Sequence, residues 1–70
     1  MTYEELQQRA ANNEDVPQGL DLADTVQFIG LRYLFASFKA GIISKQTGKH
    51  DKEMLERAYK TFREGKQLRL

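Results

Sequence analysis

The segment over residues 21–40 most restricts what this chain can fold into, because it is apolar on nearly every side when drawn as a helix. At about 100° per residue, only a narrow stripe formed by Thr25, Arg32 and Lys39 is polar. Two apolar faces flank that stripe. One face holds Val26, Ile29, Tyr33, Ala36 and Ala40, and the other holds Phe28, Leu31, Leu34, Phe35 and Phe38. A helix of this kind is buried nearly all round, so residues 21–40 need cover from more than one neighbour.

Capping residues mark the ends of the expected helices. Thr2 with Glu5 forms a capping box, which satisfies two free backbone N–H groups at a helix start. Asp21 suits a second start, and Gly41 suits a stop because glycine adopts the left-handed conformation without strain. Ser44 is a good N-cap for a third helix. The predicted helices span about residues 3–11, 21–40 and 45–64. No alternation of Val, Ile and Thr indicates a strand, so we expect one all-α domain over residues 1–70, a short helix followed by an antiparallel helical hairpin.

The size of the chain predicts self-association. At 70 residues with no Cys, a chain usually needs a metal or a second copy to complete its core. One and a half helices cannot cover two apolar faces, so we expect a homo-oligomer. The alternative is that the short helix and the loop after it fold back tightly and cover both faces. The predicted oligomer interface consists of Val26, Phe28, Ile29, Phe35 and Phe38.

The residues for catalysis are nearly absent. Without Cys there is no disulfide scaffold, thiolate metal site or thiol nucleophile, which favours a reducing cytoplasm. His50 is the single imidazole, so a His-based metal cluster within one chain is impossible. No phosphate-binding glycine loop or nucleophile elbow is present. No apolar run approaches the roughly 18 residues of a membrane span, and no basic-then-apolar leader opens the chain. We therefore expect a non-enzymatic protein with no metal, no cofactor and no membrane partner.

Charge is divided unevenly along the chain, which raises the question of an anionic partner. Residues 1–43 hold three basic and six acidic groups, whereas residues 44–70 hold eight basic and four acidic groups. Residues 43–57 resemble a helix-turn-helix with Gly48 in the turn, and Lys49, Lys52 and Arg57 would then contact DNA. The alternative, which the low net charge of +1 favours, is a continuous helix through Gly48.

A second anion-binding hypothesis uses a pocket at a subunit interface. Cationic side chains would pair with phosphate, and tyrosine rings would stack on a base. The alternative for the tyrosines is core packing, with the hydroxyl reaching a partner. The candidate ligand-binding residues are Arg32, Tyr33, Lys39, Tyr59 and Arg63.

The stretch Leu31-Arg32-Tyr33-Leu34-Phe35-Ala36-Ser37-Phe38-Lys39-Ala40-Gly41-Ile42-Ile43-Ser44-Lys45 resembles small helical proteins of Firmicutes phages and prophages. Phe35 and Phe38 stand where those proteins commonly have Tyr, and Thr47-Gly48 stands where Gln-Ala is common. The resemblance implies a phage origin and the cytoplasm of an infected or lysogenic bacterium.

The helical layout is also similar to that of phage anti-defence proteins that sequester cyclic nucleotides as oligomers. This similarity implies a sponge for a host cyclic-nucleotide immune signal as the leading function. A helix-turn-helix DNA-binding regulator is the second hypothesis. The third is an inhibitor that docks on a host defence protein through Phe28, Phe35 and Phe38.

Overall fold

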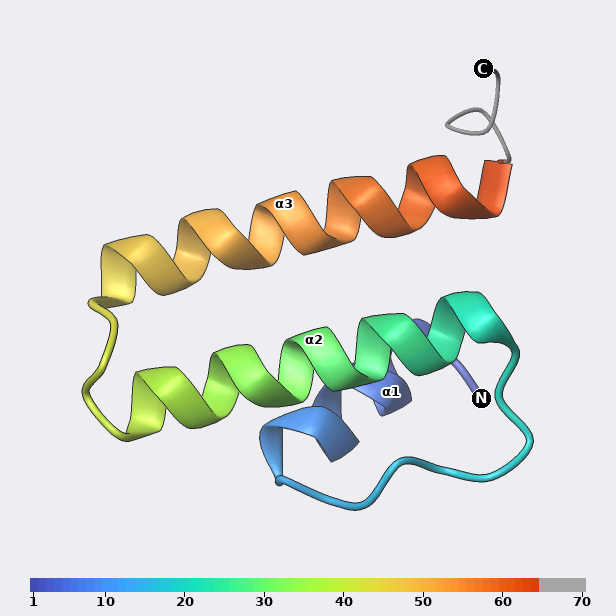
Figure 1. Cartoon of the computed structure of the whole chain (residues 1–70), viewed down its shortest axis with the longest axis horizontal. Coiled ribbons are helices and arrows are strands. Elements are labelled where there is room, and N and C mark those ends of the chain that lie inside the picture. Colours follow the sequence, from blue (N-terminus) through green and yellow to red (C-terminus); the bar gives the residue numbers. More distant parts are fainter. Residues whose placement is uncertain (65–70) are drawn as a thin grey trace.

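The computed structural model describes residues 1–64, which form three helices and no strand. They are α1 (Tyr3–Ala11), α2 (Leu22–Lys39) and α3 (Lys45–Glu64). Helices α2 and α3 run antiparallel as a hairpin, and α1 packs beside α2 (Figure 1). The all-α prediction with three helices is confirmed, and each helix begins and ends within one residue of its predicted range.

Both ends of α1 are capped. The Thr2 Oγ1 accepts a hydrogen bond from the Glu5 backbone N–H at 3.2 Å, and the Glu5 carboxylate accepts one from the Thr2 N–H at 3.2 Å. At the other end, Asn13 has a φ of 59°, a left-handed conformation that Asn tolerates better than most residues. That conformation lets the Glu14 N–H donate to the Arg9 carbonyl at 3.1 Å, which closes the helix.

The predicted caps of the hairpin are confirmed as well. The Asp21 carboxylate accepts from the Asp24 N–H at 2.9 Å and starts α2. Gly41 has a φ of +76° and ends α2, with the Ile42 N–H donating to the Ser37 carbonyl at 2.9 Å. The Ser44 Oγ accepts from the backbone N–H three residues on at 3.1 Å and starts α3.

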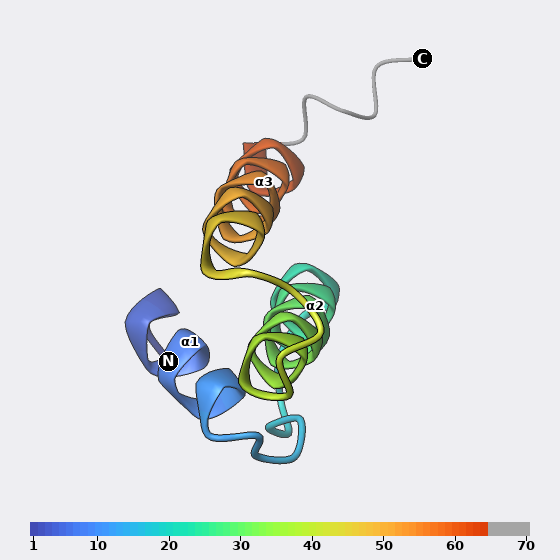
Figure 2. The same cartoon turned by 90° about the vertical axis from the view of Figure 1, so that its left-hand side faces the viewer.

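The core lies mainly between α1 and α2. Leu6 and Ala10 of α1 meet Phe28 and Leu31 of α2, and all four are buried. The partly buried residues packed against this cluster are Tyr3, Val16, Leu20, Phe35 and Leu55. Since Val16 and Leu20 belong to the loop after α1, the short helix and its loop do fold back over one apolar face of α2. Figure 2, which views the hairpin from its turn, shows α1 and α3 on different sides of α2.

This core corrects part of the predicted oligomer interface. Phe28 is 0% exposed inside its own protomer, so it is not available to a second chain. Phe35 packs against the same core. The face that α1 and its loop cover therefore includes all of the Phe28 ring and part of the Phe35 ring. The burial of Phe28 also removes it from the predicted host-protein surface.

Helix α3 lies close to α2 but shares little of the core. A Cβ placed on Gly30 of α2 would lie 3.2 Å from the Leu55 Cδ2 of α3, so Gly30 marks a close approach of the two helices. No side chain within residues 45–64 is fully buried. Helix α3 therefore covers only one side of α2 and keeps much of its own apolar surface exposed.

The turn of the predicted helix-turn-helix is absent from residues 43–57. Helix α3 is continuous from Lys45 to Glu64, and the Gly48 N–H donates to the Ser44 carbonyl at 2.9 Å as part of its first turn. The favoured prediction of a continuous helix through Gly48 is therefore confirmed, and the placement of Gly48 in a turn is wrong. Glycine lowers helix propensity by only about 1 kcal/mol, and the surrounding residues support the helix.

Candidate functional site

One side of the hairpin carries an exposed apolar surface, which we call the outer face. It consists of Leu22, Val26, Ile29 and Tyr33 on α2 together with Met54 on α3. Leu22 and Tyr33 are 68% and 77% exposed. The α2 residues are spaced four, three and four apart and carry no charge. This spacing places them on one side of the helix, turned away from the Phe28–Leu31 core.

A recess opens on the outer face between α2 and α3. Its volume is about 630 Å³. Its polar lining residues are Ser37, His50 and Asp51, and the others are apolar side chains or glycine. Concave apolar surface of this size is typical of a place where another molecule binds.

Two of the predicted ligand-binding cations instead anchor α1. The Arg32 Nη1 donates to the Glu14 backbone carbonyl at 3.0 Å, and the Lys39 Nζ donates to the Ala11 backbone carbonyl. The Arg32 guanidinium also lies over the Phe28 ring, 5.8 Å from its centroid. These contacts hold the end of α1 and the start of its loop against α2.

Two further predicted residues form a polar cluster at the start of α2. The Tyr59 hydroxyl donates to the Asp24 Oδ1 at 2.6 Å, and the Arg63 Nη1 pairs with the Asp21 Oδ2 at 2.5 Å. Burial, followed by the hydrogen bond to the Asp24 carboxylate, raises the pKa of Tyr59 to about 12. The pKa of Asp21 is lowered, first by the Asp24 N–H and then by the Arg63 guanidinium.

The Tyr59 ring also links α3 to α1. Its centroid lies 5.0 Å from that of Tyr3, with the rings tilted at 45°. The Tyr3 hydroxyl in turn accepts a hydrogen bond from the Gln27 side chain at 2.8 Å. Burial raises the pKa of Tyr3. These contacts agree with the alternative given above for Tyr59, in which the ring packs inside the protein and the hydroxyl bonds a partner.

The five candidate ligand-binding residues therefore occupy separate places in the protomer. Arg32 and Lys39 of α2 contact the end of α1. Tyr59 and Arg63 of α3 contact the start of α2. Tyr33 of α2 lies on the outer face. Four of them already have partners within their own chain.

The candidate DNA-binding residues are also divided. Lys49 and Lys52 line one recess, together with the rings of Phe35 and Phe38. Arg57 lines a different hollow, which includes Met54. The periodicity of α3 separates them, since Arg57 lies on another side of the helix.

The predicted oligomer interface is brought together only in part. Val26 and Ile29 lie on the outer face, whereas Phe38, which is 44% exposed, lines the recess of Lys49 and Lys52. Sequence reasoning missed Leu22 and Met54. Leu22 could have been found, because it continues the Val26–Ile29 stripe by one further turn. Met54 depends on how α3 packs beside α2 and has no such local signal.

Comparison with known proteins found no matching family model, no matching curated protein and no matching solved structure. Among the helices of residues 1–64, none is both long and apolar enough to cross a membrane. The same residues contain no group of three or more His, Cys, Asp or Glu side chains placed to hold a metal ion.

Proposed function

We propose that this chain is a non-enzymatic protein that acts by binding and that assembles with a second copy of itself through the outer face. The observation that supports the proposal is the exposure of Leu22, Val26, Ile29, Tyr33 and Met54 on one side of the hairpin. A contiguous exposed apolar patch on a small protein marks an interaction surface. The face of α2 that α1 and its loop cover is already buried within the protomer. The outer face is exposed and needs a second chain to bury it.

The spacing of the outer face favours a second copy as its occupant. Apolar residues at alternating steps of four and three form the seam of a helix pair. An antiparallel pairing of two α2 helices would set Leu22 opposite the partner's Tyr33 and Val26 opposite the partner's Ile29. It would also place the positive end of each helix dipole beside the negative end of the other.

The recess between α2 and α3 supports the same proposal. It opens beside Ile29, Tyr33 and Met54, so a side chain from a second copy can enter it. Tyrosine is enriched at such contacts because its ring is large and its hydroxyl tolerates water. A twofold pairing uses each recess once and leaves both protomers equivalent.

Sequestration of a cyclic nucleotide remains a narrower hypothesis about what the assembly binds. The contacts of Arg32, Lys39, Tyr59 and Arg63 within one chain give it no support as a site built from those four side chains. DNA binding through a helix-turn-helix has no support either, because residues 45–64 form one continuous helix without the required turn. We therefore propose the binding protein and its assembly without a cyclic-nucleotide site built from the five candidate residues and without a helix-turn-helix.

Sedimentation equilibrium of the native chain and of Ile29→Glu tests the proposal. We expect the native chain to reach twice its 8.1 kDa mass with rising concentration. We expect Ile29→Glu to weaken that association at least about tenfold, because an unpaired carboxylate would be buried at the seam.

The matched control is Ile42→Glu, since Ile42 is 76% exposed and lies outside the outer face. It should leave the association unchanged, and circular dichroism should show equal helix content in all three proteins. A native chain that stays monomeric at every concentration would overturn the proposal and return the outer face to a different protein partner. Equal weakening by both substitutions would also overturn it.

A further inference from the structure

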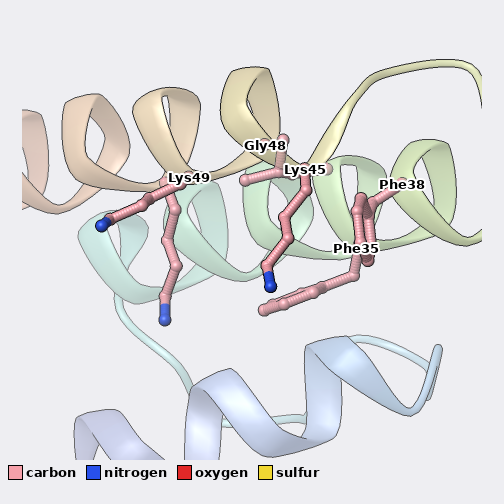
Figure 3. A pocket seen from close by; sticks show the side chains of 7 residues that line it. Phe35, Phe38, Lys45, Gly48 and Lys49 are labelled. Atoms are coloured by element: carbon pink, nitrogen blue, oxygen red, sulfur yellow. The ribbon is translucent and has the colours of Figure 1, made fainter.

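A second recess, on the other side of the hairpin, combines three lysines with two phenylalanines. Helix α3 contributes Lys45, Lys49 and Lys52, and helix α2 contributes Phe35 and Phe38 (Figure 3). The recess has a volume of about 290 Å³, and its remaining lining residues are Leu34 and Gly48. In Figure 3 the Lys45 side chain extends toward the Phe35 ring. Leu34 lines both this recess and the one on the outer face, so it separates them.

Helical periodicity explains why these side chains gather. Lys45, Lys49 and Lys52 are spaced four and three apart on α3, which places them on one side of that helix. Phe35 and Phe38 are three apart on α2 and turn toward the same space. The absence of a side chain at Gly48 keeps this space open, because a Cβ there would lie 3.7 Å from the Phe38 Cδ1.

The three ammonium groups have no counter-charge of their own. Within residues 1–64, the side chain of none of these lysines forms a hydrogen bond or an ion pair with another residue. No carboxylate lines the recess. Other cations of the protomer do have acceptors, as Lys39 and Arg63 show. Three positive charges on one side of α3 give the recess a positive potential, which favours an anion as its ligand.

We propose that this recess binds a small phosphate-bearing ligand that carries a flat ring, with the size and chemistry of a mononucleotide. The phosphate would meet the lysine ammonium groups, and the ring would stack on the exposed part of Phe38 or Phe35. Three lysines suit a dianionic phosphate better than a single carboxylate. The volume of about 290 Å³ lies just below the range typical of ligand sites, about 300–1,000 Å³, which suits a ligand no larger than one nucleotide unit.

The proposal does not depend on the assembly through the outer face. All seven lining residues belong to one protomer, and none of them is Leu22, Val26, Ile29, Tyr33 or Met54. Binding should therefore persist in Ile29→Glu, which separates a failure of this site from a failure of the proposed self-association.

Nuclear magnetic resonance titration of the full chain with adenosine 5′-monophosphate tests the site. We expect saturable shifts at the Gly48 and Lys49 amides and at the ring protons of Phe38, with a Kd on the order of 1 mM. Adenosine alone and inorganic phosphate alone should each bind at least about fivefold more weakly, since each lacks one half of the interaction.

The deciding variant is the double substitution Lys45→Ala, Lys49→Ala. It should weaken binding by about tenfold or more, whereas Lys60→Ala, which removes an exposed lysine elsewhere on α3, should not. The absence of saturable shifts up to about 10 mM ligand would overturn the proposal. So would unchanged binding in the double variant, or adenosine that binds as tightly as its monophosphate.

Discussion

Gly41 and Gly48 lie on either side of the hairpin turn and differ in what they require of glycine. Gly41 has a φ of +76° with no atom within 4 Å of an added Cβ, so its constraint lies in the backbone alone. Gly48 lies inside α3, where an added Cβ would make ordinary contacts at 3.6 Å to Ile43 and 3.7 Å to Phe38. The same chemical change at these two positions should therefore have opposite effects.

We expect Gly41→Ala to lower the free energy of unfolding by about 1–2 kcal/mol, because a left-handed conformation strains a residue with a Cβ. Gly48→Ala should raise that free energy by up to about 1 kcal/mol through helix propensity. Urea unfolding at one fixed protein concentration measures both. A destabilised Gly48→Ala would mean that the recess beside Phe38 tolerates no additional methyl group.

Tyr59 allows a direct test of the polar cluster at the start of α2. Its pKa is raised to about 12 because the neutral phenol is partly buried and donates to Asp24. A raised pKa in the folded state means that this contribution to stability is complete below the ordinary value of 10.0 and is lost as pH rises toward 12.

Titration of the Tyr59 ring signals by nuclear magnetic resonance should show this ionisation near pH 12. Asp24→Asn removes the carboxylate that the phenol bonds, so the pKa of Tyr59 should fall toward its ordinary value. An unchanged midpoint in that variant would show that burial alone sets the pKa.

At the scale of the elements, α1 persists because its neighbours hold it. A helix of nine residues is too short to be stable alone in water. It buries Leu6 and Ala10 against α2, and Arg32 and Lys39 bond the carbonyls at and just beyond its end. Arg32 and Lys39 of α2 therefore hold the C-terminal end of α1 in place.

We expect Arg32→Ala to loosen α1 while leaving the α2–α3 hairpin in place. A hydrogen bond from a charged donor is worth about 1.5–3 kcal/mol, so its loss should make the amides of α1 exchange with deuterium at least roughly tenfold faster. Lys60→Ala serves as the control, because Lys60 is an exposed cation of α3 and bonds neither of the carbonyls that Arg32 and Lys39 hold. Equal protection of α1 in both variants would show that Leu6 and Ala10 suffice.

At the scale of the whole molecule, the helices could be predicted from the sequence because their ends depend on neighbouring residues. Thr2, Asp21, Gly41 and Ser44 each act on backbone groups within a few positions. The covered face of α2 could not be predicted in the same way. It depends on the path of the loop that carries Val16 and Leu20. The spacing of apolar residues in the sequence does not indicate that path.

The candidate sites were predictable in part for a similar reason. Lys49 and Lys52 share a helix face, so the proposal that they bind an anion could be made from their spacing, and the structure adds Lys45 and the phenylalanine rings to the recess. Arg32 and Lys39 were assigned to a ligand because both are cations on the polar stripe of α2, whereas in the structure they bond main-chain oxygens. Because every residue has a main-chain carbonyl, such acceptors cannot be recognised in a sequence. A carboxylate partner would be an Asp or Glu and could be recognised.

The same main-chain acceptors make the connection between α1 and α2 tolerant of mutation. Every amino acid carries a carbonyl oxygen, so replacement of the Ala11 or Glu14 side chain leaves the bonds from Lys39 and Arg32 in place. Only the two donor side chains on α2 are specific to these bonds, so a substitution of Arg32 or Lys39 removes the corresponding bond. A change of side chain at either acceptor position, Ala11 or Glu14, is therefore nearly neutral for these two bonds.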